Sequence, residues 1–203
     1  SAGSANGTGT GASFNNPRGV AVDGSGNVYV ADYYNHLIRK ITSAGVVTTL
    51  AGSGSSGSAN GTGTAATFTN PQGVAVDGSG NVYVTGYFYG TADFDPSSST
   101  ANLSSNGGAD IFFAKYDTDG NYQWAHNIGG SSSDHGVSIT VDGSSNVYVT
   151  GDFLNTADFY PGAGTANLSS NGSSNSDIFF AKYNYEYVFR NSITSGHKCS
   201  YGR

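Results

Sequence analysis

The chain has 203 residues, a formal net charge of −6 at pH 7 and only 11% charged residues, which excludes the basic surface that a nucleic-acid partner requires. Glycine contributes 31 residues and methionine none, and this shortage of helix-forming residues excludes a helical protein. Aromatic residues make up 13% of the sequence, so intrinsic disorder does not describe the whole chain.

Four short apolar runs follow one another in the first quarter of the chain. Clusters of turn-forming residues separate them, as at Gly24–Asn27, and this spacing predicts four strands. Because the runs are apolar at consecutive positions, we expect each strand to be covered on both faces, as happens when small sheets stack. The four runs lie at residues 19–23, 28–32, 37–42 and 46–52.

The same pattern recurs twice further along the chain. Residues 15–30 return almost unchanged at 69–84, and residues 76–96 return at 141–161. A four-stranded antiparallel unit repeated in this way is typical of a β-propeller blade. We therefore predict an all-β fold, a single β-propeller segment over residues 1–193 with three visible blades. These blades cover about residues 15–52, 69–129 and 136–193.

The last twenty residues differ in composition from everything before them. They hold the only cysteine, Cys199, so no internal disulfide is expected. We expect residues 185–193 to form a degraded fourth strand of the third blade, with Ile193 at the position that Ile128 holds in the second. Residues 194–203 are expected to be an atypical, disordered tail; a truncated or frame-shifted end and a tag are the alternatives.

Two known repeat families are similar to these blades. The first blade, NPRGVAVDGSGNVYVADYYNHLIRKI, resembles an NHL repeat and includes the triplet Asn35-His36-Leu37. The second and third blades resemble the bacterial SBBP-type β-propeller repeat through VDGSGNVYVTGYF, GTADFDP, DIFFAKYD and YQWA. The resemblance implies one module of a large secreted or cell-surface bacterial protein. Some NHL-like propellers are lyases or lactonases with a metal in the central channel, which is the alternative that the resemblance carries.

The predicted connections are short at one end of the blades and long at the other. The first-to-second and third-to-fourth turns are tight, whereas the other connections are long, as at 53–72, 89–109 and 154–176. An antiparallel meander places all the long connections on one face, and long loops on a rigid scaffold commonly carry binding sites. Flexible filler is the alternative, because Ser, Gly and Asn dominate these loops.

Aromatic residues fall at the ends of the second strands, beside the long loops. Tyrosine offers rigid, amphipathic contact area, so we predict that these residues form a stacking rim for a peptide or glycan ligand. Packing between blades is the alternative. The predicted ligand-binding residues are Tyr33, Tyr34, Tyr87, Tyr89 and Phe153.

Aspartates in the second blade supply the candidate metal site. Calcium prefers oxygen ligands, so Asp93, Asp95 and Asp110 are predicted to hold it, with turn caps as the alternative explanation. The repeated VDGSGN motif resembles an anion-binding loop only in part, because it leads into a strand and not into a helix. The run 117–121 begins like a calcium loop but lacks the later ligands. Tight turns explain both better. The four histidines show no metal-ligand spacing.

These observations favour a non-catalytic extracellular binding or scaffolding module with a protein or glycan ligand and no membrane span. A metal-dependent lyase or lactonase and a purely structural spacer are the alternatives. No cofactor other than calcium is predicted for the binding module. Three blades are half of a six-bladed ring and leave two blade faces uncovered, so a homodimer that completes the ring is also predicted.

Overall fold

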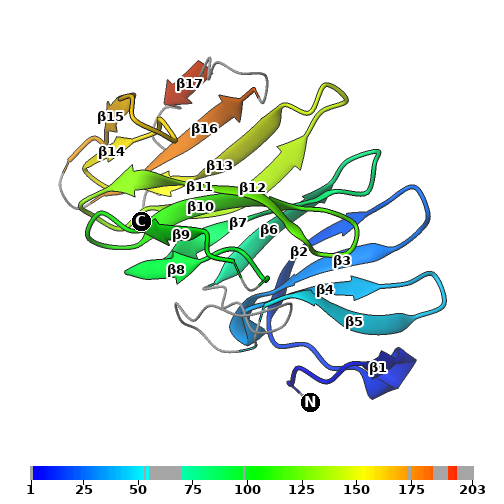
Figure 1. Cartoon of the computed structure of the whole chain (residues 1–203). Coiled ribbons are helices and arrows are strands. Elements are labelled where there is room, and N and C mark those ends of the chain that lie inside the picture. The colour runs from blue at the N-terminus through cyan, green and yellow to red at the C-terminus, as the bar shows by residue number, and fades with distance from the viewer. Residues whose placement is uncertain are drawn as a thin grey trace, which may run out of the picture.

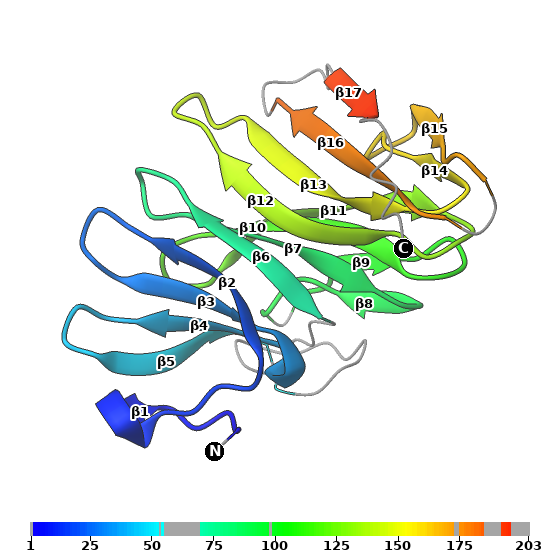
Figure 2. The ribbon, with the colours of Figure 1, turned by 180° about the vertical axis from the view of Figure 1, so that it is seen from behind.

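A computed structural model describes residues 2–52, 54, 70–97, 99–172, 175–184 and 192–195. Three antiparallel sheets stack side by side like blades, with tight turns at one end and longer connections at the other (Figure 1). The predicted all-β propeller architecture is therefore confirmed, and the described sheets form an open stack rather than a closed ring (Figure 2).

Each blade is a four-stranded meander, and the blades follow one another along the chain. Blade 1 contains β2 (Pro17–Val22), β3 (Val28–Asp32), β4 (Leu37–Ile41) and β5 (Val46–Ala51). Blade 2 contains β6 (Pro71–Val76), β7 (Val82–Phe88), β10 (Asp110–Tyr116) and β11 (Tyr122–Gly130). Blade 3 contains β12 (His135–Val141), β13 (Val147–Phe153), β16 (Asp177–Tyr183) and β17 (Ser192–Ser195).

The fourth strand of blade 3 lies later in the sequence than predicted. β17 begins at Ser192 and pairs with β16 so that Ile193 lies opposite Ala181, whereas Ala125 holds the equivalent place opposite Ala114 in blade 2. The alignment of Ile193 with Ile128 is therefore wrong by three positions. Two residues of the expected tail belong to this strand; residues 185–191 and 196–203 lie outside the described part of the chain.

Two of the long connections contain hairpins that the sequence analysis treated as loops. β8 (Thr91–Asp93) pairs with β9 (Asn102–Ser104), and β14 (Thr156–Asp158) pairs with β15 (Asn167–Ser169). The second hairpin also extends blade 2, because β14 pairs with the end of β11. The hairpin of blade 3 thus covers the last two residues of the outer edge of blade 2, and a covered edge does not invite pairing with other chains.

The tight turns between the first and second strands of the blades are built from one repeated aspartate arrangement. In blade 1, the Asp23 carboxylate accepts hydrogen bonds from the backbone N–H of Ser25 and Asn27, from the Asn27 side chain and from the Tyr29 hydroxyl, all at 2.8–3.1 Å. Asp77 and Asp142 repeat this arrangement. Since the carboxylate occupies the backbone donors, the predicted structural explanation of VDGSGN is confirmed and a phosphate cradle there is excluded.

The hydrophobic core lies between the blades and consists of two separate clusters. One joins blades 1 and 2 around Tyr29, Val84 and Phe112, and the other joins blades 2 and 3 around Phe113 and Phe179. Successive residues of β10 therefore face opposite neighbours. This explains why the strand reads as a continuous apolar run, as buried strands do.

The N-terminal segment, residues 2–16, lies over the outer strands of blade 1. It contains β1 (Gly7–Thr8), which pairs with β5, and a short 3-10 helix, η1 (Gly9–Gly11). The fully buried Arg39 forms a 3.0 Å ion pair with Asp32 and donates hydrogen bonds to the carbonyls of Ala5 and Ser13. A buried ion pair thus holds this segment on the sheet.

A second 3-10 helix, η2 (Tyr33–Asn35), connects β3 and β4. No helix among the described residues has the length and apolar character that crossing a membrane requires.

Candidate binding site

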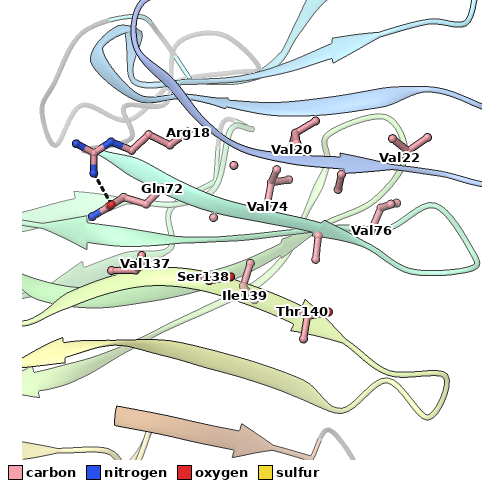
Figure 3. A pocket seen from close by; sticks show the side chains of 14 residues that line it. Arg18, Val20, Val22, Gln72, Val74, Val76, Val137, Ser138, Ile139 and Thr140 are labelled. Atoms are coloured by element: carbon pink, nitrogen blue, oxygen red, sulfur yellow. Dashed lines mark hydrogen bonds between the residues drawn. The ribbon is translucent and has the colours of Figure 1, made fainter. Parts of the chain in front are cut away.

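Each innermost strand carries a β-bulge close to its first residue. The pairing register shifts between Pro17 and Val20 in β2, and equivalent shifts occur in β6 and β12. Bulges re-aim side chains, and here they carry the equivalent residues Arg18, Gln72 and Val137. The three strands line an open groove of about 610 Å³ (Figure 3).

Arg18 and Gln72 begin a polar and aromatic cluster at the long-loop end of this groove. The Arg18 Nη1 donates a 2.6 Å hydrogen bond to the Gln72 side chain (Figure 3), and its guanidinium carbon lies 3.8 Å from the centre of the Tyr33 ring. The hydroxyls of Tyr33 and Tyr87 are 2.6 Å apart. A stacked arginine and a tyrosine pair therefore join blade 1 to blade 2.

The cluster continues from blade 2 to blade 3. The ring centroids of Tyr87 and His135 are 4.6 Å apart with an interplanar angle of 75°, and His135 Nδ1 lies 3.1 Å from the Asp152 carboxylate. The hydrogen bond to Asp152 raises the pKa of His135 from its ordinary value of 6.5, against the effect of burial. Burial and the hydrogen bond with Tyr33 raise the pKa of Tyr87, so its hydroxyl stays protonated near neutral pH.

Two further tyrosines flank this arrangement and remain open to solvent. Tyr34 is 57% exposed and Tyr89 is 56% exposed. Their rings lie 4.9 Å from Tyr33 and 6.0 Å from Tyr87, measured between centroids. We call the set the tyrosine–arginine cluster; it consists of Arg18, Tyr33, Tyr34, Gln72, Tyr87, Tyr89 and His135.

Four of the five predicted rim residues therefore meet in one place, and the fifth does not. Phe153 is fully buried between blades 2 and 3, with its ring 5.3 Å from that of Phe159. Its prediction as a ligand-binding residue was wrong because the end of β13 is covered by its own blade's hairpin. Arg18, Gln72 and His135 were not among the predicted binding residues. The change from Arg18 to Gln72 at one position of otherwise matching repeats could have indicated that this position is functional.

The three aspartates of the predicted calcium site fall into two groups. Asp93 and Asp95 lie near Tyr116, at one end of β10, while Asp110 lies at the other end of that strand. The Asp93 Oδ1 accepts the backbone N–H groups of Asp95 and Ala101, which closes the β8–β9 hairpin. Among the described residues, no group of three or more His, Cys, Asp or Glu side chains is placed to hold a metal ion.

Asp110 instead faces a second buried carboxylate that the sequence analysis did not single out. A Cβ placed on Gly129 would lie 2.8 Å from the Asp110 Oδ1 and 3.0 Å from the Asp134 Oδ2. Asp134 accepts hydrogen bonds from the backbone of Gly130 and Leu154, whereas the Asp110 Oδ1 is buried without a hydrogen-bond partner. Burial is the main cause that raises the pKa of Asp110 to about 6, and the charge of Asp134 adds to it.

Comparisons with known proteins identify the repeats. The family model of the NHL repeat matches residues 14–41, and that of the beta-propeller repeat SBBP matches residues 50–91 and 123–152. An uncharacterized WD repeat-containing protein of Acanthamoeba polyphaga mimivirus is 32% identical over 98 residues, which cover 41% of this chain and 7% of that protein. The chain thus spans a small part of the length of this relative.

Proposed function

Because the chain is a β-propeller repeat protein with an NHL repeat and SBBP repeats, we propose that it is a non-catalytic interaction module that binds a peptide segment of a partner protein. The proposed binding surface is the tyrosine–arginine cluster. A secreted or cell-surface bacterial location, which the repeat resemblance implies, is part of the proposal.

The observation that carries this proposal is the exposure of Tyr34 and Tyr89 beside a rigid support. Tyr33 and Tyr87 are hydrogen-bonded to each other across two blades, and Tyr33 also lies under Arg18. The exposed rings of Tyr34 and Tyr89 therefore contact side chains that are already ordered. Rigid tyrosines lose little conformational entropy on binding and are enriched in binding surfaces. Similarity to a WD repeat-containing protein also supports interaction with a protein.

A peptide fits this surface for a second reason. Arg18 is exposed and supplies a fixed cation that can donate to a carboxylate or a main-chain carbonyl. His135, with its raised pKa, adds positive charge as the pH falls. We therefore expect the bound segment to carry an acidic side chain or a free carboxyl terminus.

The test is selection of binders from a displayed random peptide library and, in parallel, from a glycan array, using the full chain. Changing Tyr34 and Tyr89 together to alanine should weaken the selected peptides at least about tenfold, or about 1.4 kcal/mol, measured by calorimetry. R18Q should weaken acidic peptides more than neutral ones. The matched control is V46S, which alters an exposed residue on the outer strand of blade 1.

Selection of glycans alone would overturn the choice of a peptide. Absence of any saturable binder would overturn the binding proposal and favour the structural spacer. The lyase or lactonase alternative stays a prediction; activity sensitive to a chelator would support it.

A further inference from the structure

Blades 2 and 3 contain the same seven residues, DIFFAKY, in strands β10 and β16, but only one copy is covered. Ile111 and Phe113 of blade 2 are 0% and 1% exposed. Ile178 and Phe180, which hold the same positions in blade 3, are 54% and 43% exposed. Identical side chains thus differ in burial because blade 2 has a following blade packed on it.

The contacts of blade 2 show what these side chains accept. The Phe113 ring stacks on Tyr183 of blade 3 with centroids 4.6 Å apart, and Ile111 packs so closely on Gly136 that a Cβ there would lie 2.8 Å from it. On blade 3, the same positions form an open apolar groove of about 660 Å³, lined by Val137, Thr150, Gly151, Asp152, Ile178, Phe179 and Phe180. The groove therefore has the form of one half of a blade–blade interface.

The complementary face lies on blade 1, where only the innermost strand is exposed. Val74 in β6 packs against blade 1 and is 6% exposed, and its counterpart Ile139 packs against blade 2 and is 5% exposed. The counterparts in blade 1 are Val20 and its neighbour Val22, which are 65% and 61% exposed. The centre of this face is buried, since Val30, Leu37 and Arg39 are 8%, 4% and 0% exposed and Arg39 holds the N-terminal segment there. Val20 and Val22 on β2 are therefore its uncovered part.

We propose that copies of this chain associate head to tail, with the open face of blade 3 packed on the exposed strand β2 of blade 1 of a second copy. The contact uses the face of blade 3 that corresponds to the packed face of blade 2, and the part of blade 1 that the N-terminal segment leaves uncovered. Two such contacts, made reciprocally by two copies, give a dimer. The interface is heterologous, because the two faces that meet are different surfaces.

The test measures solution mass by size-exclusion chromatography with light scattering. We expect the unmodified chain to elute at twice its mass of 20.7 kDa. One variant carries V20D and V22D and the other carries I178D and F180D, and each should remain monomeric with an unchanged circular dichroism spectrum. The matched control, V46D, places a charge on an exposed valine outside both faces and should still associate.

Mixing the two variants separates this proposal from every symmetric alternative. Each variant keeps one intact face, so an equimolar mixture should form a complex of one copy of each. Recovery of association in the mixture also shows that both variants are folded. Dimers of the V20D/V22D variant alone would mean that blade 3 packs on itself. A monomeric unmodified chain at 0.1–0.2 mM, roughly the concentration at which weak contacts of about 5 kcal/mol become visible, would mean that the faces do not meet. Either result overturns the proposal.

Discussion

At the scale of single residues, aspartate performs two opposite tasks in this protein. In the turns, Asp142 accepts four hydrogen bonds, and that of the Asn146 side chain is the largest cause that lowers its pKa to about 2. Near Gly129, burial raises the pKa of Asp110 to about 6. The turn aspartate therefore stabilises the fold when it is charged, and Asp110 stabilises it when it is protonated.

The pH dependence of stability should separate these two tasks. Asp110 keeps a proton in the folded state up to about pH 6 but loses it near pH 3.8 when unfolded, so its contribution is present below pH 3.8 and is lost as the pH rises through 6. D110N should remove this loss of stability with rising pH. The loss amounts to about 2 kcal/mol in the free energy of unfolding between pH 4 and pH 7, as urea unfolding would measure it. An unchanged pH profile in D110N would contradict the assignment.

The control for that measurement is D177N. Asp177 holds the equivalent place in blade 3, accepts the same hydrogen bonds from Asn171 and is partly open to solvent. Urea unfolding of D110N and D177N side by side separates the effect of burying the carboxylate from the loss of the hydrogen bonds that both aspartates accept.

Repetition decides which residues could be predicted from the sequence. The turn aspartates occur in every blade at the same distance from Asn and Tyr, so their structural role was readable. Asp134 lies in a connection whose length differs between blades, and its proximity to Asp110 depends on how this connection folds back beside Gly129 of β11. Nothing in the local sequence encodes such a fold.

At the scale of elements, the N-terminal segment depends on the ion pair between Arg39 and Asp32. Asp32 also accepts hydrogen bonds from the Asn15 backbone and the Asn35 side chain, and Arg39 donates to Asn6. One buried pair thus connects β3, β4, η2 and the segment that covers them. Removing one partner leaves the other charge buried.

R39M should therefore destabilise the chain by about 3 kcal/mol in urea unfolding. The segment should also become accessible, so that limited proteolysis cleaves within residues 2–14 under native conditions, as mass spectrometry would detect. K40M, on the neighbouring and partly exposed side chain, is the control and should cost less than about 1 kcal/mol. Equal protease resistance of R39M and the unmodified chain would contradict this account.

The inserted hairpins mark the limit of what strand patterns could predict. Thr91 and Ser104 share a 2.8 Å hydrogen bond across β8 and β9, and Thr156 and Ser169 repeat it. Runs as short as TAD and NLS have too few apolar residues to stand out among polar loops. Their exact recurrence in both blades was the signal that the sequence analysis did not use.

At the scale of the whole molecule, the two hydrophobic clusters lie between blades. Phe113 and Phe180 provide an internal comparison, since they are the same residue in the same heptapeptide with and without a covering blade. F113A should cost about 3–4 kcal/mol, because it opens a cavity in the interface between blades 2 and 3.

F180A should cost less than about 1 kcal/mol when measured at a concentration at which the chain is monomeric. Urea unfolding of both variants provides the comparison. Equal losses of about 3–4 kcal/mol in the free energy of unfolding would mean that Phe180 is covered in solution. Equal losses of less than about 1 kcal/mol would mean that the interface between blades 2 and 3 contributes little.

The pairing of β14 with β11 bears on how such repeats can be moved between proteins. A cut at the boundary between blades 2 and 3 would separate β14 from β11, because the hairpin belongs by sequence to blade 3 and by hydrogen bonding to blade 2. A segment cut inside the blades would keep this pairing but would separate β10 from β7 and β13 from β16. A transferred blade is thus expected to need the hairpin of the following blade in addition to its own four strands.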